Sequence, residues 1–489
     1  MPPKLTNRIK HINNVRLAGQ PSTWDITISY PTPSGTITSI TPHEEQDTKQ
    51  TQTTKPESKS KSEPESEPPL ALPALTHPHI HLDKAFIHSS PSYAPFLPKT
   101  GTFQEALTNT TKAKAQFTHA DLLKRGEWLL AESFAAGVTA MRAFVEVDHT
   151  VQHACLAAAS ELKEKWSPAV EIQIVCYAQD PIFSSDHGAE NLRFVSDALE
   201  IYPQIDVLGT TPYVETSVAA AKRNIEWAVE SALRWDIHLD FHLDYHLDGE
   251  REPLVWHVVR VLKARGWTTA STGKRVMLGH CSRLTLFSEE EWIRLAGEIR
   301  ENDLPVSFVG LPTSDVYMAS PPAGGDGNGN ELAPQSRLRG TLQILDMIRK
   351  YGLDAVAGVN NVGNSFTPWG LPDPLALACL GVGVYQAGSQ DDAELLFECV
   401  STRARVAIGL NCSDSDVGSG LAIKEGSRAD LLLVCCRDDT GCGIVRPRTN
   451  AAEVVWTPPE KVNRDVISGG QLKISPFGSA ESENVYRFL

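Results

Sequence analysis

The sequence predicts an α/β protein in which eight strand and helix pairs form a (β/α)8 barrel, while both chain ends form a small composite β-sandwich domain. Short apolar runs rich in β-branched residues alternate with longer amphipathic segments between residues 71 and 410. Eight such runs occur, which favours a closed barrel over an open, doubly wound sheet. Both chain ends instead carry short alternating strands and turns.

The N-terminal region is predicted to contribute strands to the composite domain. Three segments of alternating polarity lie at 12–17, 24–28 and 36–40 within residues 1–43. Residues 44–70 are instead rich in Lys, Glu, Ser, Thr, Gln and Pro and almost lack apolar side chains. Such a segment cannot bury enough surface to offset its ordering entropy, so we expect a disordered insertion there.

The barrel is assigned to residues 71–410. Amphipathic segments such as 122–136, 217–235 and 289–301 are expected to form helices between the strands. The runs expected to form the strands are residues 74–81, 138–147, 171–178, 205–210, 237–242, 276–280, 305–310 and 355–360.

The C-terminal region, residues 411–489, is expected to complete the composite β domain. Segments 426–434, 452–456 and 466–470 are interpreted as strands and turns. Within the barrel, the glycine-rich stretch 324–330 lacks the strand, turn and helix frame and the lysine of a phosphate-binding loop. We interpret it as a flexible loop near the seventh strand.

The composition and net charge of the chain restrict the kinds of molecule that it is expected to bind. A chain of 489 residues with 41% hydrophobic content can bury a large core, and its formal charge of -15 disfavours nucleic acid and anionic membranes. No run approaches the roughly 18 apolar residues of a membrane span, and the start lacks the apolar core of a secretory signal. We expect a cytoplasmic protein with reduced cysteines that acts on a small molecule, and a homo-oligomer is left open.

Histidines at the end of the first run are the strongest chemical signal. Residues two apart on a strand share a face, so His79 and His81 are expected to point together into the barrel mouth and to bind one metal ion. His77 would extend the row. Taken alone, a His-x-His pair is as often a packing feature as a ligand pair. Lys84, which follows, is interpreted as an outer-rim charge, with contact to an anionic substrate group as the alternative.

Alternating polar residues mark the fifth run. His238, Asp240, His242, Asp244 and His246 share one face of an extended segment, and that face must turn inward if its polar groups are to have partners. Only the carboxyl end of the strand opens into the mouth. We therefore favour His242 as the third metal ligand and place Asp244 in the loop beyond it. His238 and Asp240 are expected to be hydrogen-bonded core; a solvated edge strand is the alternative.

Three further strand ends carry polar candidates. The sixth run ends in His280, and Gln179 follows the third run. A lone histidine in such a place is more often structural, but the convergence of several strand ends on one rim favours function. Asn360 and Asn361, in the eighth run and directly after it, are candidates for substrate binding by hydrogen bonds, although Asn and Gly clusters are also ordinary loop residues.

These motifs resemble the cytosine-deaminase and isopropylammelide-hydrolase branch of the amidohydrolase superfamily. The resemblance rests on residues 78–84, on the strands that end in His242 and His280, and on residues 358–370. It covers nearly the whole chain outside the insertion. It implies a TIM-like barrel and a composite β domain built from both chain ends.

The resemblance also implies site roles. His79, His81 and His242 would hold one divalent metal ion, Zn²⁺ or Fe²⁺. His280 would stabilise the attacking hydroxide or the developing oxyanion. Gln179 occupies the place where deaminases of this type read the amide edge of a pyrimidine.

Two positions depart from the pattern of that family. The family ends strand eight with an aspartate that binds the metal and accepts the water proton, and this chain has Asn360 there. The family also places a glutamate proton shuttle three residues after the strand-five histidine, where this chain has Tyr245, a phenol with a pKa of roughly 10. Proton transfer to the leaving nitrogen is therefore expected from His280, Asp244 or His246.

The motifs together predict a metal-dependent hydrolase that cleaves a C–N bond in a small cyclic amide, amidine or related heterocycle. A divalent ion held by neutral imidazoles can lower the pKa of a water molecule to roughly 7. Two alternatives remain. The losses at Asn360 and Tyr245 suggest a catalytically impaired descendant that binds a metal or a small molecule, and the same Lewis acid could serve a decarboxylase or another lyase.

Overall fold

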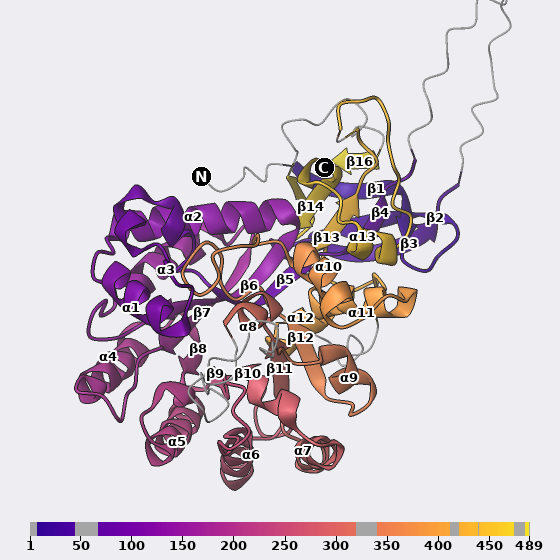
Figure 1. Cartoon of the computed structure of the whole chain (residues 1–489). Coiled ribbons are helices and arrows are strands. Elements are labelled where there is room, and N and C mark those ends of the chain that lie inside the picture. The colour runs from indigo at the N-terminus through magenta and orange to yellow at the C-terminus, as the bar shows by residue number, and fades with distance from the viewer. Residues whose placement is uncertain are drawn as a thin grey trace, which may run out of the picture. The chain divides into compact units, whose positions relative to one another are not determined.

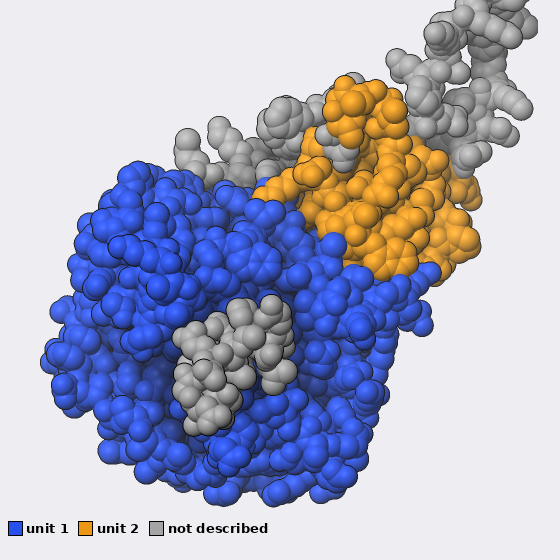
Figure 2. All heavy atoms as spheres, viewed as in Figure 1, with its two compact units in different colours: residues 1–2, 75–420 blue, residues 3–74, 421–489 orange. Residues whose placement is uncertain are grey.

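The computed structural model describes residues 7–44, 67–318, 340–410, 420–438, 440–473 and 485–488. The glycine-rich stretch 324–330, and residues 45–66 of the expected insertion, lie outside these ranges. The chain divides into two compact units (Figure 2). The larger unit comprises Leu75–Gly420, and the smaller unit comprises Pro3–Ala74 together with Leu421–Leu489.

The larger unit contains eight parallel strands in chain order, and each predicted run forms one of them, which confirms the barrel prediction. An isolated parallel bridge between Ile80 and Asn360 joins the first strand to the segment after the last. The strands are β5 (Leu75–His81), β6 (Val138–Glu146), β7 (Glu171–Ala178), β8 (Ile205–Thr210), β9 (His238–Leu243), β10 (Val276–His280), β11 (Val306–Gly310) and β12 (Asp354–Ala357) (Figure 1).

Helices lie between these strands, and several of them begin at a side chain that caps the first turn. Thr118, Ser217 and Ser288 each accept a hydrogen bond from the backbone N–H three residues on. Gly137, with a φ of 114°, ends the helix before β6. The helices of the larger unit are α1 (Phe103–Lys114), α2 (His119–Ala136), α3 (Ala154–Trp166), α4 (Gly188–Ile201), α5 (Val218–Trp235), α6 (Val255–Ala264), α7 (Glu289–Glu301), α8 (Pro312–Met318), α9 (Ile344–Arg349), α10 (Pro374–Val384), α11 (Gln390–Cys399) and α12 (Thr402–Ala407).

Side chains fill the interior of the barrel. Every residue of β5, β6 and β10 is buried, as expected for parallel strands covered on both faces. Asp240 forms a buried ion pair with Arg142 at 3.4 Å, and His238 Nδ1 accepts a hydrogen bond from the Arg275 backbone N–H at 2.8 Å. Both residues are therefore hydrogen-bonded core, as the sequence predicts. Polar groups that can meet a substrate lie at the carboxyl ends of the strands.

The smaller unit has one sheet built from strands of both chain ends, as predicted. Its order is β15-β14-β13-β4-β1-β2-β3, and β15 also pairs with β1, so that five strands form a closed circle of pairings. Its core includes Ile12, Ile26, Leu433 and Ile467. The strands are β1 (Asn7–Leu17), β2 (Thr23–Ser29), β3 (Thr36–Pro42), β4 (Leu70–Pro73), β13 (Leu431–Val434), β14 (Arg464–Ser468), β15 (Gln471–Lys473) and β16 (Tyr486–Phe488).

Two local expectations for this unit were wrong. Segment 452–456 does not form a strand but lies in the short helix α13 (Ala451–Trp456), because the side chain of Asn450 accepts a hydrogen bond from the Glu453 N–H and caps a helical turn. Strand β4 pairs with β1 and β13, so Leu70–Pro73 belongs to this sheet and not to the barrel. Among the described helices, none combines the length and apolarity needed to cross a bilayer.

Candidate active site

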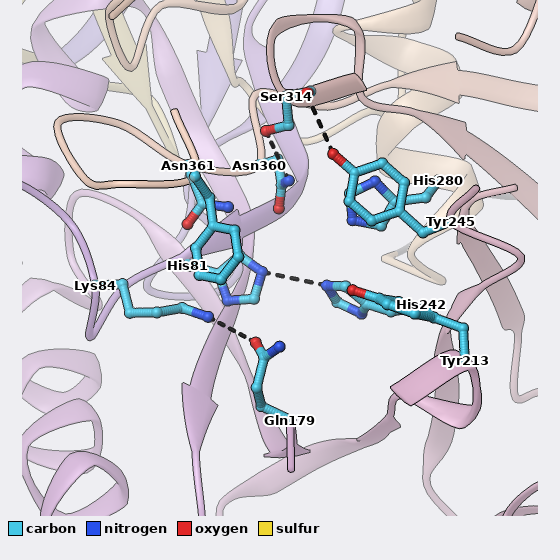
Figure 3. A pocket seen from close by; sticks show the side chains of 11 residues that line it. His81, Lys84, Gln179, Tyr213, His242, Tyr245, His280, Ser314, Asn360 and Asn361 are labelled. Carbon is cyan, nitrogen blue, oxygen red and sulfur yellow. Dashed lines mark hydrogen bonds between the residues drawn. The ribbon is translucent and has the colours of Figure 1, made fainter. Parts of the chain in front are cut away.

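Three imidazoles from two strands meet at the carboxyl end of the barrel. His79 and His81 are two residues apart on β5, and His242 lies near the end of β9. The Nε2 atom of His242 lies 3.1 Å from His79 Nε2 and 3.2 Å from His81 Nε2 (Figure 3 shows the second contact). The structure thus brings the three predicted ligands together. His77 does not join them, because its Nε2 contacts Ser133 Oγ at 3.2 Å.

Burial keeps these three imidazoles neutral. The rings of His79, His81 and His242 have at most 3% exposure. Burial lowers the pKa of each ring well below 6.5, and neighbouring imidazoles and Lys84 lower it further. Neutral imidazole is the form that binds a metal ion. Three rings in mutual contact cannot match all their lone pairs with N–H donors, whereas a cation between them satisfies all three.

The spacing of the three nitrogens fits a first-row metal ion. Ligand nitrogens about 2.0–2.1 Å from a tetrahedral ion lie about 3.3 Å from one another. The observed separations of 3.1 and 3.2 Å are close to this value. Gly358 makes room for the cluster, because a Cβ there would lie 2.9 Å from a Leu311 methyl carbon and 3.1 Å from the Cβ of His79.

Asn360 offers an oxygen atom that could act as a fourth metal ligand beside the three imidazole nitrogens. Its backbone N–H donates to the His79 carbonyl, and its carbonyl accepts from the His81 N–H, so Asn360 lies beside both ligands. Its Nδ2 donates to Ser314 Oγ at 2.8 Å, and Ser314 Oγ contacts Thr367 Oγ1 at 2.7 Å. The amide oxygen is buried without a hydrogen-bond partner among the described residues and points toward the imidazoles in Figure 3.

His280 lies next to the imidazole cluster, with a carboxylate behind it. Its Nδ1 contacts Asp315 Oδ1 at 2.8 Å, and the other oxygen of Asp315 accepts from the Leu311 N–H and from Thr341 Oγ1. Asp315 therefore holds the proton on Nδ1 and leaves Nε2 free to exchange a proton. The ring of Tyr245 stacks on that of His280 at 3.8 Å, and its hydroxyl donates to the Ser314 carbonyl.

Asp244 and His246 have other partners. The oxygens of Asp244 accept hydrogen bonds from the Leu254 and Val255 N–H groups, at the start of α6. Burial raises the pKa of Asp244 to about 6. His246 Nδ1 accepts from the Asp248 N–H. Neither side chain lines the pocket around the imidazoles. This geometry supports a role for Asp244 in holding the loop after β9.

The pocket at this end of the barrel encloses about 290 Å³, including space open to solvent. Its walls include the predicted substrate-binding residues Gln179, Asn360 and Asn361, together with Tyr213 and Phe366.

Lys84 also lines this pocket, which corrects its interpretation as an outer-rim charge. It is 1% exposed, and its Nζ donates to Gln179 Oε1 at 2.8 Å and pairs with Glu146 Oε1 at 2.7 Å (Figure 3 shows the first contact). The sequence could not reveal this, because Glu146 comes from another strand.

A second group with the spacing of metal ligands contains Asp148, His149 and Asp180. The ammonium of Lys114, on α1, lies 2.5 Å from Asp148, 2.6 Å from Glu146 and 3.2 Å from Asp180. Burial alone would lower the pKa of Lys114, but the three carboxylates raise it well above 10.5. The carboxylates are thus paired with a cation of the chain itself.

Comparison with known proteins gives a result at the level of structure. No protein-family model and no curated protein matches the chain. 5-Methylcytosine deaminase from Klebsiella pneumoniae matches with a TM-score of 0.72 and 19% identity, over 96% of this chain and 98% of that one. N-isopropylammelide isopropylaminohydrolase from Burkholderia multivorans ATCC 17616 matches with a TM-score of 0.66 and 22% identity, over 94% and 97%. An adenosine deaminase from Xanthomonas campestris with bound zinc gives 0.56 and 12%, over 97% of each chain.

The chain has an amidohydrolase fold. Within this fold, sequence reasoning missed Asp315, Ser314 and Glu146. A weak signal existed for the first two, because Pro312-Thr313-Ser314-Asp315 directly follows a strand, as polar residues at barrel sites do. Glu146 ends β6, and the apolar run 138–147 around it hides its carboxylate as a candidate in the sequence.

Proposed function

We propose that this amidohydrolase-fold protein is a metal-dependent hydrolase that cleaves a C–N bond in a small cyclic amide, amidine or related heterocycle. The observation that carries the proposal is the convergence of three neutral imidazoles, His79, His81 and His242, on one point in a pocket. The similar deaminases and hydrolases act on small nitrogen heterocycles according to their names, which supports the same class of substrate here.

The residues present fit a single divalent ion, Zn²⁺ or Fe²⁺, with His79, His81 and His242 as nitrogen ligands and Asn360 Oδ1 as an oxygen donor. Such an ion, when bound, supplies Lewis acidity and lowers the pKa of a water molecule to about 7. Asn360 contributes no negative charge, so the ligand set leaves the charge of a divalent ion uncompensated.

His280 is proposed to carry the proton of the reaction. Hydrolysis forms a C–O bond with the water oxygen, breaks the C–N bond, and moves one proton from that water to the leaving nitrogen. His280 Nε2 can take this proton and return it to nitrogen, while Asp315 holds Nδ1–H and stabilises the imidazolium. Tyr245 cannot replace the missing glutamate, because burial raises the pKa of its phenol well above 10.

The test combines metal analysis with a substrate screen. Protein purified without chelators should contain one divalent ion per chain, and a panel of pyrimidines, triazines and lactams should include a ring from which ammonia or amine is released. His280→Ala should lower kcat by about two to four orders of magnitude and leave the bound metal in place. Asp315→Asn should lower kcat with little change in KM.

Four outcomes oppose the proposal in different ways. Tight metal with no turnover across the panel favours a protein that binds a metal or a small molecule, which is the reading suggested by Asn360 and Tyr245. Release of carbon dioxide identifies a lyase. Wild-type turnover in His280→Ala would contradict the proton-transfer role of His280. Absence of any bound metal would contradict the proposal of a metal-dependent hydrolase.

We also infer a cytoplasmic setting without nucleic-acid or membrane partners. The formal charge of -15 opposes binding to phosphate-rich surfaces. Fractionation of cells that express the tagged chain tests the location, and light scattering tests whether a homo-oligomer forms.

A further inference from the structure

The backbone of Asn360 is fixed between two of the imidazole ligands, which leaves only its side-chain amide to turn. Its N–H donates to the His79 carbonyl at 3.0 Å, and its carbonyl accepts from the His81 N–H at 2.8 Å. Its φ of 66° lies in the left-handed region, which Asn adopts more readily than most residues. A half-turn of the amide exchanges its oxygen and its NH2 group. The orientation of the amide therefore decides which of the two groups faces the imidazoles.

Two hydroxyl groups lie on the other side of this amide. Asn360 Nδ2 donates to Ser314 Oγ at 2.8 Å, and Ser314 Oγ contacts Thr367 Oγ1 at 2.7 Å (Figure 3 shows the first contact). All three side chains are at most 2% exposed. With its NH2 group bound in this way, the amide turns its oxygen toward the imidazoles, where that oxygen is buried without a hydrogen-bond partner among the described residues.

Ser314 is itself held in place by its surroundings. Its backbone carbonyl accepts a hydrogen bond from the Tyr245 hydroxyl at 3.2 Å (Figure 3). The preceding residue, Thr313, donates through Oγ1 to the Val359 carbonyl at 2.9 Å and so ties the start of α8 to the segment that carries Asn360. The two positions at which the chain departs from the family pattern, Asn360 and Tyr245, thus both bond to Ser314.

Without an acceptor on this outer side, the NH2 group of Asn360 would find partners on the inner side. The three imidazoles are neutral and bring their nitrogen atoms to one point, where a lone pair can accept an amide N–H. A cation at that point requires the amide oxygen instead. Turning the amide back would then oppose metal binding, because only the fraction of molecules with the oxygen inward would be ready for the ion. A carboxylate has no such alternative, since its two oxygens are equivalent.

We infer that Ser314 is the positioning residue that keeps the amide oxygen of Asn360 turned toward the imidazoles, and that this chain needs it because an amide has one end that repels a cation. The inference rests on the metal ion of the proposed function and names a residue that prepares the site for it. Ser314 acts through Asn360, and its hydroxyl is an acceptor for the amide.

Zinc affinity tests this role without any turnover. Full-length protein is stripped of metal with a chelator, and zinc is titrated back in competition with a chromophoric chelator. Ser314→Ala removes the acceptor and should weaken zinc binding about tenfold or more. Ser365→Ala is the matched control, because the Ser365 hydroxyl is also buried but contacts His88 and not Asn360. The control should bind zinc with wild-type affinity.

The same substitution in an Asn360→Asp background separates positioning from a general structural role. The carboxylate offers an oxygen to the ion in either orientation, so adding Ser314→Ala there should weaken zinc binding by no more than about twofold. Thr367→Val keeps Ser314 and removes the hydroxyl beside it. This variant should weaken zinc binding in the same direction as Ser314→Ala, and it provides the test if Ser314→Ala does not fold.

The possible failures are distinguishable. Wild-type zinc affinity in folded Ser314→Ala, an equal loss in Ser365→Ala, or an equal loss in the Asn360→Asp background would overturn the inference and leave the proposed hydrolase standing. Where Ser314→Ala does not fold, wild-type affinity in Thr367→Val would do the same. A wild-type protein that binds no zinc would overturn both. Weakened zinc binding in Ser314→Ala without turnover of any heterocycle would retain the positioning role and contradict the proposed reaction.

Discussion

Two clusters of ionisable groups lie at the carboxyl ends of the barrel strands, and they balance their charges in opposite ways. The imidazole cluster, His79, His81 and His242, contains no charged partner among its members and directs three nitrogen atoms at one point. The lysine network, Lys84 and Lys114 with Glu146, Asp148 and Asp180, pairs each of its carboxylates with an ammonium.

The difference shows that ligand spacing alone does not define a metal site. Both regions contain three groups close enough to hold an ion. In the lysine network, Lys114 already supplies the positive charge that the carboxylates need. In the imidazole cluster, lone pairs meet with no proton or cation to share. The comparison therefore favours the imidazole cluster over the lysine network as the proposed site of an external ion.

Removing one imidazole should have the largest effect. His242→Ala leaves two ligands from a single strand, so the bound metal should fall from one ion per chain to near zero by elemental analysis. Asp180→Asn is the matched control in the lysine network and should keep the full metal content. If Asp180→Asn lost metal as completely as His242→Ala, the assignment of the ion to the imidazoles would fail.

Breaking the lysine network should cost stability and spare the metal. Lys114→Met leaves buried carboxylates without their cation, so the free energy of unfolding should fall by about 3–5 kcal/mol in urea titrations. Lys112→Met, two residues earlier on the exposed face of α1, should change it by less than about 0.5 kcal/mol. Equal effects of the two substitutions would contradict a structural role for the network.

Metal removal should destabilise the protein through the imidazole cluster. At a free ion concentration about a hundred times Kd, binding adds about 2.7 kcal/mol to the free energy of unfolding. Chelation should therefore lower Tm in the wild type and in Lys112→Met. The same treatment should leave Tm unchanged in His242→Ala, and a shift of wild-type size in that variant would place the ion elsewhere.

The fourth effect is confined to acid pH and concerns the buried histidine below the cluster. Burial first, and then nearby arginine and lysine charges, lower the pKa of His238 from 6.5 to about 3, so the unfolded chain binds a proton in this window that the folded chain does not. The contribution of His238 to the free energy of unfolding is fully present above pH 6.5. It is lost as pH falls from 6.5 toward 3, by up to about 1.4 kcal/mol per pH unit.

His238→Asn keeps an acceptor for the Arg275 N–H and removes this titration. In metal-free protein, the difference in unfolding free energy between wild type and variant should therefore change with pH below 6.5 and stay constant above it. The difference isolates His238 from carboxylates such as Asp240, whose pKa is raised by burial and whose contribution has the opposite sign. Parallel pH curves for the two proteins would show that His238 does not titrate in this way.

The sequence by itself determined the strands of the barrel and the three imidazoles. Both follow from local periodicity, because alternation with a period of two places His79 with His81 and gives His242 the inward face at the end of its strand. Local periodicity also misled once, at 452–456, where two adjacent valines suggested a strand and the cap at Asn450 started a helix.

Only the tertiary structure decided which partners surround these residues. Lys84 looks like a rim charge in the sequence and is instead a buried residue of the pocket lining, because Glu146 on β6 reaches it. Asp315 contacts His280 because the start of α8 lies next to the end of β10 at the barrel rim. Such contacts join residues from different strands and helices. Their strength depends on burial and on distances of about 3 Å, which no spacing along the chain encodes.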